Sequence, residues 1–232
     1  MIERLDNHSA PQRPPMTTNL PWVGLLLAFA GGTTDAYSYL MRDKVFANTI
    51  TGNVVMLAYY TPQGRFDVYP RYLIPMLAFF LGVLFGESLH MRTWPQSSRR
   101  REAVASGLLV ALLAAVGFMP ATLNLLATSC IAFACGVQIV TYPQVNGLDV
   151  STTMCTANLR RTGHWFFSYL QTRDASDFRR MLYFLELNLS FALGAVVQAL
   201  IVGTLGTFSI LPAVLVHLFL WARVFFPPKT QY

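Results

Sequence analysis

The sequence predicts an all-α membrane protein with six transmembrane helices in two inverted three-helix repeats that contain re-entrant or half-helical segments. Three observations lead to this prediction: an apolar composition, an alternation of basic connections, and an internal repeat. Of the 232 residues, 54% are hydrophobic and 12% are charged, against about 25% charged residues in an ordinary soluble domain. The chain therefore has the composition of a membrane protein.

Six stretches approach the length of about 20 apolar residues that crosses a hydrocarbon core of about 30 Å. They lie at 20–41, 72–91, 103–120, 124–142, 183–203 and 207–226. We expect residues 1–19, where prolines stand among polar residues, to form a flexible cytoplasmic tail. Residues 227–232 are expected to form a short cytoplasmic end.

Lys and Arg concentrate in alternate connections. The N-terminal tail, the 92–101 and 160–180 connections and the C-terminal end hold most of the 17 basic residues, whereas the turns at 121–123 and 203–206 hold none. Cytoplasmic loops carry such an excess of basic residues. We therefore expect both termini in the cytoplasm, and we attribute the net charge of +6 to topology rather than to a nucleic-acid partner.

Two further stretches, 45–61 and 144–159, have no crossing assigned to them, so each must end on the side where it began. The second contains many Asn, Asp, Ser and Thr residues, which are costly to expose to lipid. Irregular backbone at membrane depth is tolerated where protein or water satisfies it, which favours re-entrant or half-helical segments. An eight-crossing arrangement with both stretches inserted is the alternative.

These two stretches belong to an internal repeat, whose halves we name repeat 1 (20–120) and repeat 2 (121–226). The matching pairs, in chain order, are "LAFAGG" at 27–32 with "IAFACG" at 131–136, "VFANTITGNV" at 45–54 with "VSTTMCTANL" at 150–159, and "FFLG" at 79–82 with "FALG" at 191–194. Because each half has three crossings, the second half enters the membrane upside down. Secondary transporters have this organisation, and their binding sites lie near the bilayer midplane.

Asp35 lies about two thirds of the way along the first predicted helix. A carboxylate near a helix centre costs about 2.5 to 3.5 kcal/mol to insert, so Asp35 is expected to face the protein interior or a water-filled cavity. Two interpretations stay open: a proton or cation site, and an acceptor that fixes the neighbouring re-entrant segment. Glycines beside Asp35 and on the second predicted helix indicate close helix packing, within the chain or between subunits. They are Gly31, Gly32, Gly82 and Gly86.

Neutral polar side chains of both repeats are further candidates for the lining of a substrate or ion pathway. They are Thr49, Thr51, Asn53, Gln138, Thr153, Thr156 and Asn158. Helix capping is the alternative, because Thr51, Gly52 and Asn53 suit the start of a short helix. Gln138 aligns with Thr34, whereas Ile139 stands at the position of Asp35, so any carboxylate chemistry is confined to repeat 1.

The sequence contains no enzymatic motif, so we expect no enzymatic activity and no cofactor. Glu87 and His90 have the Glu-x-x-His spacing of di-metal helix bundles, but such sites need a second copy and further carboxylates. We therefore expect no metal site. The odd number of cysteines, Cys130, Cys135 and Cys155, suits buried free thiols.

The stretch "GGTTDAYSYLMRDKVFANTITGNVV", residues 31–55, resembles the YoaK-like family of small bacterial multi-pass membrane proteins, a domain of unknown function. The resemblance rests on Asp35, Ala36 and Tyr37, on Val45 and Phe46, and on Thr51, Gly52 and Asn53. It implies an integral protein of the bacterial inner membrane, and it implies no mechanism.

These features predict a small permease or channel-like transporter of an unknown solute or ion, with Asp35 binding or exchanging a proton or cation. The alternative is a membrane-embedded interaction or scaffold protein that transports nothing. The expected partners are the lipid bilayer and a small solute or ion. A homo-oligomer is consistent with the thin wall that 232 residues would form around a pathway.

Overall fold

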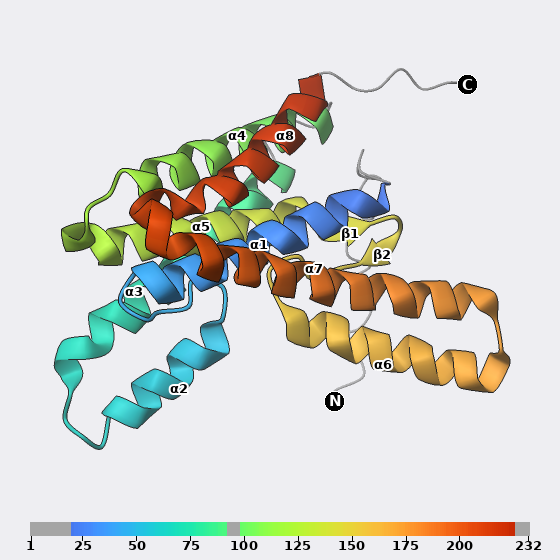
Figure 1. Ribbon diagram of the computed structural model, residues 1–232, viewed down its shortest axis with the longest axis horizontal. Helices are drawn as coiled ribbons and strands as arrows, with labels where there is room; N and C mark the ends of the chain where they lie inside the picture. The colour runs from blue at the N-terminus through green and yellow to red at the C-terminus, as the bar shows by residue number, and fades with distance from the viewer. Residues whose placement is uncertain (1–19, 92–97, 226–232) are drawn as a thin grey trace.

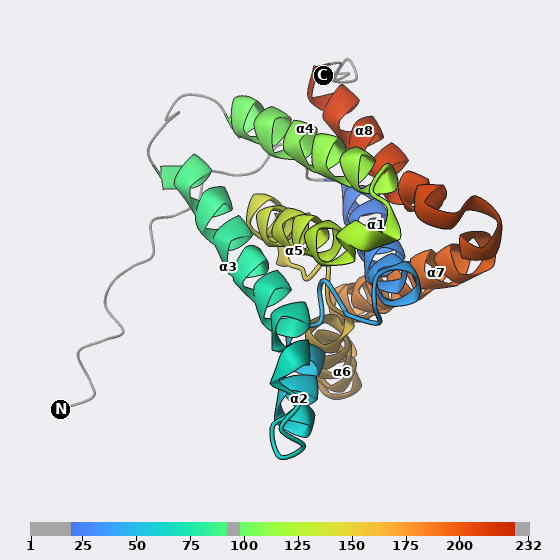
Figure 2. The same cartoon turned by 90° about the vertical axis from the view of Figure 1, so that its left-hand side faces the viewer.

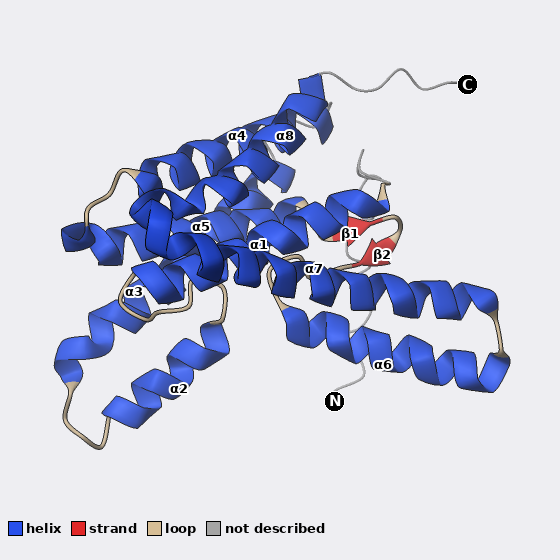
Figure 3. Cartoon of the chain, in the orientation of Figure 1, coloured by secondary structure: helices blue, strands red, loops and turns tan. Residues whose placement is uncertain are grey.

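The computed structural model describes residues 20–91 and 98–225, which form eight α-helices, three short 3-10 helices and one β-hairpin (Figures 1 and 3). In chain order the elements are α1 (Pro21–Met41), α2 (Ile50–Tyr60), η1 (Phe66–Val68), α3 (Tyr69–Met91), α4 (Ser98–Gly117), η2 (Ala121–Leu123), α5 (Asn124–Thr141), β1 (Gln144–Val145), β2 (Leu148–Asp149), α6 (Cys155–Thr172), α7 (Ala175–Leu205), η3 (Gly206–Ile210) and α8 (Leu211–Phe225). The predicted tail at 1–19 and the end at 227–232 lie outside the described residues.

Helices occupy all six stretches that were expected to cross the membrane, and the helical class is confirmed. Among the described residues, three helical stretches are long and apolar enough to span a bilayer: Phe66–Leu89, Ala121–Thr141 and Ala175–Phe225, the last of which combines α7, η3 and α8. Ile50–Tyr60 and Glu102–Gly117 are shorter apolar helices. α1, which carries Asp35, is not among the three. The protein is therefore a helical membrane protein.

Local sequence signals account for several boundaries. Pro21 begins α1, where its missing N–H is no loss. Asp174 caps α7 by accepting a hydrogen bond from the Ser176 backbone N–H at 2.8 Å. This bond holds the pKa of Asp174 below its ordinary value. Between β1 and β2, Asn146 and Gly147 both have positive φ, the conformation that a tight hairpin turn requires.

α1 and α5 form the centre of the molecule. In Figure 2, α7 and α3 flank this pair, α4 and α8 lie together above it, and α2 and α6 lie below it. α1 runs parallel to α7 and α5 runs parallel to α3, whereas α4 and α8 are antiparallel. Two contacts show the direction in each case. For α1 and α7 they are Gly24 with Tyr183 and Tyr37 with Thr207, and for α3 and α5 they are Gly82 with Phe133 and Gly86 with Val140. For α4 and α8 they are Gly107 with Trp221 and Gly117 with Ile210.

The closest backbone contacts come in matched pairs. A Cβ atom on Gly32 of α1 would overlap the carbonyl oxygen of Phe191 of α7, and a Cβ on the aligned Gly136 of α5 would overlap that of Phe79 of α3. The reciprocal contacts are Gly194 with Phe29 and Gly82 with Phe133. Glycine permits this approach because it has no side chain. The same four-residue contact therefore occurs twice, once in each parallel helix pair.

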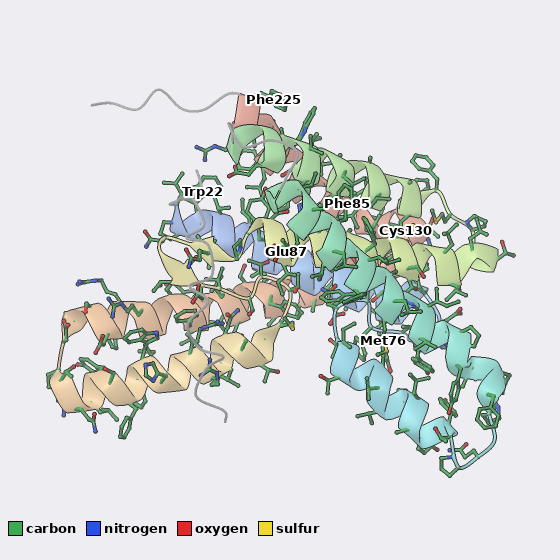
Figure 4. The ribbon with its side chains drawn as sticks, turned by 180° about the vertical axis from the view of Figure 1, so that it is seen from behind. Trp22, Met76, Phe85, Glu87, Cys130 and Phe225 are labelled. Carbon is green, nitrogen blue, oxygen red and sulfur yellow. The ribbon has the colours of Figure 1, made fainter. Side chains whose placement is uncertain are left out.

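The outer surfaces of α3 and α7 are also matched. Each helix exposes a stripe of large apolar side chains at aligned positions: Leu77, Leu81 and Leu84 on α3, and Leu189, Leu193 and Val196 on α7. Apolar stripes of this size are unusual on soluble monomers and suit contact with lipid. Aromatic side chains pack together where α1 begins and α8 ends: the rings of Trp22 and Phe219 lie 6.0 Å apart, and those of Trp221 and Phe225 lie 5.1 Å apart (Figure 4 labels Trp22 and Phe225). Such a position is typical of membrane interfaces.

Candidate functional site

Two irregular segments enter the middle of the helical bundle, one from each repeat. Residues 42–49 connect α1 to α2, and residues 142–154 connect α5 to α6. In Figure 1 the first turns of α2 and α6 lie near the centre of the molecule, and the two helices lead away in opposite directions. Both segments contact Gly31. The Asn48 side-chain amide donates to the Gly31 carbonyl at 3.1 Å, and a Cβ on Gly31 would lie 3.2 Å from the Cα of Thr153.

Asp35 lies one helical turn beyond Gly31 and is 7% exposed. One carboxylate oxygen accepts a hydrogen bond from the Asn48 backbone N–H at 3.1 Å, and the other accepts from the Thr49 hydroxyl at 3.0 Å. The positive end of the α2 dipole lies beside this carboxylate, because Asn48 and Thr49 come directly before α2. Asp35 therefore holds the first irregular segment in place. This is the acceptor role that the sequence left open.

Two aligned asparagines close the loops that precede α2 and α6. The Asn53 side chain donates to the Phe46 carbonyl at 2.7 Å, and that of Asn158 donates to the Ser151 carbonyl at 2.6 Å. Asn158 also accepts from the Ser151 backbone N–H at 3.0 Å.

Thr51, Gly52 and Asn53 lie at the start of a short helix, as expected, but they do not cap it. α2 begins earlier, at Ile50, and no side chain caps either α2 or α6. The hydroxyl of Thr49, the N-cap residue, is already bonded to Asp35. Thr51 therefore lies inside the first turn of α2.

Gln138 joins the second irregular segment to both central helices. Its side chain is buried and donates to the Thr152 hydroxyl at 3.0 Å and to the Leu27 carbonyl of α1 at 3.4 Å. Ile139, at the position of Asp35, is half-buried. Repeat 2 therefore holds its segment with a neutral amide where repeat 1 uses a carboxylate.

The remaining candidates divide into exposed and buried groups. Thr49, Thr51 and Thr156 are exposed around the first turns of α2 and α6. Thr153 is buried, and its hydroxyl has no hydrogen-bond partner. The predicted packing glycines face neighbouring helices within the chain: Gly32 faces α7, and Gly82 and Gly86 face α5.

Two residues near Asp35 were missed by the sequence argument. Asn48 aligns with Thr153, so the repeat itself could have identified it. Arg42, the first residue of the first irregular segment, lies just beyond the first predicted helix. It is 0% exposed. No sequence signal distinguishes it from the other loop arginines.

Arg42 bonds to the region where α4 ends and α5 begins. Its guanidinium donates to the carbonyl oxygens of Val116, Met119 and Pro120 and to the side chains of Tyr37 and Asn124, at 2.8 to 3.3 Å. The last carbonyls of a helix lack intrahelical partners, and a buried cation satisfies them well. Arg42 therefore fixes the turn between the two repeats.

Among the described residues, no three His, Cys, Asp or Glu side chains gather in a way that could hold a metal ion. The side chain of His90 lies outside the described residues. The three cysteines are free thiols as expected, but only Cys135 is buried. Cys130 and Cys155 are half-buried.

The sequence model of the family DUF1275 matches residues 23–222 of this chain. The description of this family is "protein of unknown function". The chain belongs to this family. The match covers every described helix almost completely and agrees with the resemblance carried by residues 31–55. No curated protein and no solved structure matches the chain. Function is therefore argued from the geometry around Asp35.

Proposed function

We propose that the protein is a small permease or channel-like transporter with two inverted repeats that place Asp35 and two half-helices in the middle of the bilayer. One observation carries the proposal: irregular polar segments from both repeats meet at Gly31, inside a bundle with an apolar outer surface. Non-helical backbone at membrane depth is stable only where protein or water satisfies it.

Helix directions support an inverted six-crossing topology. If α1 leads out of the cytoplasm, its parallel partner α7 does the same, and the parallel pair α3 and α5 leads back in. α4 and α8 then cross in opposite directions, as their antiparallel packing requires. Both termini lie in the cytoplasm of this proposed arrangement, in agreement with the basic connections. By the family resemblance, the membrane is the bacterial inner membrane.

In this topology α2 and α6 do not cross the bilayer. They return to opposite faces, where the connections after them are polar. The α2–α3 connection holds an exposed ion pair between Arg65 and Asp67 at 3.0 Å, and the α6–α7 connection holds the exposed Asp174 cap. Charged groups of this kind suit water or lipid headgroups.

The exposed residues Thr49, Thr51 and Thr156 then lie at the depth of the hydrocarbon core. Lipid cannot satisfy these groups or the irregular backbone beside them. A water-filled pathway along the first turns of α2 and α6 satisfies both. In the proposed mechanism Asp35, bonded to Thr49 at the edge of this pathway, binds or exchanges a proton or cation as the solute passes.

The test is flux into vesicles that contain the purified protein, under an imposed proton gradient and with a broad panel of small solutes and ions. Asp35→Asn keeps the shape of the side chain and removes its charge. We expect this variant to lose at least about tenfold in rate, the scale at which a lost charged interaction acts.

Asp177→Asn is the matched control. Asp177 is equally buried, at 7% exposed, and bonds to Ser168 and Thr172 in the α6–α7 hairpin, away from the proposed pathway. It is expected to keep the parent rate. Equal flux through the parent and Asp35→Asn would contradict the assigned role of Asp35.

The hydrogen bonds of Asp35 with Asn48 and Thr49 favour a second candidate, a membrane-embedded scaffold in which Asp35 only holds the half-helix. This candidate predicts no flux for any solute and a lower unfolding temperature for Asp35→Asn. Neither candidate assigns catalysis, a cofactor or a nucleic-acid partner to the chain. In both, the protein contacts the bilayer, and a homo-oligomer could cover part of the exposed α2 and α6 surface.

A further inference from the structure

Two aligned side chains of the irregular segments each leave a buried oxygen without a partner. Asn48 in repeat 1 and Thr153 in repeat 2 are both 1% exposed. The Asn48 side-chain oxygen and the Thr153 hydroxyl make no hydrogen bond in the described part of the chain. An unpartnered buried polar group costs about 1 to 3 kcal/mol. Such a cost at both aligned positions points to an occupant.

These two oxygens belong to the same small region as the Asp35 carboxylate. Asn48 donates its backbone N–H to Asp35 and its side-chain amide to the Gly31 carbonyl. Thr153 also packs against Gly31, where its Cα would lie 3.2 Å from a Cβ. One turn of α1 therefore brings together a carboxylate, an amide oxygen and a hydroxyl.

We propose that Asp35, Asn48 and Thr153 form a binding site for a dehydrated sodium-sized monovalent cation. The donor set contains only oxygen atoms, which hard cations prefer to nitrogen or sulfur. Unwound segments beside half-helices provide such oxygen ligands in transporters that couple to sodium. Each hydrogen-bonded oxygen of Asp35 keeps a lone pair that can bind the ion.

The charge of the site selects a monovalent ion. Asp35 contributes one negative charge through its bonds with Asn48 and Thr49, and the amino ends of α2 and α6 each add a partial positive charge of about 0.5. Divalent ions need more carboxylate ligands than this. No second acidic, histidine or cysteine ligand set gathers within the described residues.

The closure of the site selects a small ion. Neither the Asn48 oxygen nor the Thr153 hydroxyl is open to solvent. A hydrated ion, or an anion with several atoms, would have to displace both segments from Gly31. A bare sodium or lithium ion is smaller than a water molecule and demands the least displacement.

This inference deepens the proposed transport function by naming the coupling ion, and its test is a binding measurement that needs no flux. The purified protein is melted in NaCl, LiCl, KCl and choline chloride at equal ionic strength. We expect sodium to raise the melting temperature saturably. At a sodium concentration about ten times the dissociation constant, the melting temperature should be about 3 to 6 °C higher than in choline chloride. This is the shift expected for a chain of this size when bound protein outnumbers free protein about tenfold.

Thr153→Val is the decisive variant, because the valine is isosteric and the hydroxyl it removes has no partner. If the hydroxyl is a ligand, the variant melts higher than the parent in choline and loses the sodium shift. Thr153→Ser keeps the oxygen and should keep the shift. Thr141→Val is the matched control, since the buried Thr141 hydroxyl bonds to Val137 within α5, and it should also keep the shift.

Three results would overturn the ion site: equal melting in NaCl and choline, an unchanged sodium shift in Thr153→Val, or a stabilisation that follows pH alone in every salt. These outcomes are separate from the fate of the proposed function. Flux without a sodium shift removes the ion site and leaves the transporter. A sodium shift without any flux removes the transporter and leaves the ion site.

Discussion

Residues 42–60 of repeat 1 and residues 147–172 of repeat 2 begin alike and then diverge. In both, a buried valine is followed by a turn onto Gly31 and by an asparagine that closes the loop from inside the half-helix. α2 then continues for 11 mostly apolar residues, whereas α6 runs for 18 residues. α6 carries Arg160, Arg161 and His164.

The two repeats also differ at individual positions where the segments meet. Asp35 is replaced by Ile139 and Asn48 by Thr153, whereas Asn53 and Asn158 are the same residue with the same bond. Features shared by two copies of one segment report what the fold requires. Features present in one copy have either a local structural role, as at Arg42, or a role in chemistry, as proposed for Asp35.

The largest effect is predicted at Arg42, which has no counterpart in repeat 2. Arg42→Gln is expected to lower the free energy of unfolding by about 3 to 5 kcal/mol, because several buried acceptors each lose a hydrogen bond from a charged group, worth about 1.5 to 3 kcal/mol. The carbonyls of Val116, Met119 and Pro120 lose the hydrogen bond from the guanidinium. Chemical unfolding in detergent measures the change. A loss below about 1 kcal/mol would show that the turn between the repeats does not depend on Arg42.

The matched glycines provide the next test. Gly32→Ala and Gly136→Ala should each cost about 3 kcal/mol, at the upper end for overpacking, because the added methyl group meets backbone rather than a side chain. Gly163→Ala and Gly203→Ala are controls, since nothing lies within 4 Å of their added Cβ atoms. They should be neutral or slightly stabilising. A large difference between Gly32→Ala and Gly136→Ala would break the equivalence of the two helix pairs.

The loop asparagines predict a smaller and graded effect. Asn158→Ala removes two hydrogen bonds with Ser151 and a long, weak one with the Met154 carbonyl at 3.4 Å, whereas Asn53→Ala removes one bond with Phe46. At about 1 kcal/mol for each net hydrogen bond, the expected losses are about 2 and 1 kcal/mol. Thermal unfolding of both variants under one condition measures the ratio. Equal losses would show that the second bond of Asn158 adds nothing.

The sequence predicted the parts of the fold that depend on long apolar patterns. All six apolar stretches are helices. The repeat aligned Gly32 with Gly136 and Gly82 with Gly194, and the aligned glycines make equivalent contacts with their neighbouring helices. It missed the β-hairpin at 144–149, although Asn146 and Gly147 are a strong turn signal. α6 extends beyond 159 because its amphipathic surface packs on α7, a contact that no apolar run announces.

The site was predicted less completely than the fold. Asp35 was identified because a charge in an apolar helix is conspicuous. Arg42 follows the end of an apolar stretch, where arginines are common, and only the tertiary structure buries it. Side chains that bond across the bundle, such as Gln138 to Thr152, depend on which helices meet. A single sequence does not show which helices pack against one another.

In the proposed topology, the α2–α3 hairpin and the α6–α7 hairpin lie on opposite faces of the membrane. Gln63 and Gln171 are exposed near the tips of the α2–α3 and α6–α7 hairpins. In a background with Cys130, Cys135 and Cys155 replaced by alanine, Gln63→Cys and Gln171→Cys are treated in intact cells with a membrane-impermeant maleimide. The inverted topology predicts that Gln63→Cys reacts with the maleimide from outside the cell and that Gln171→Cys reacts only after permeabilisation. Labelling of both positions from the same side, as an eight-crossing arrangement would give, would contradict it.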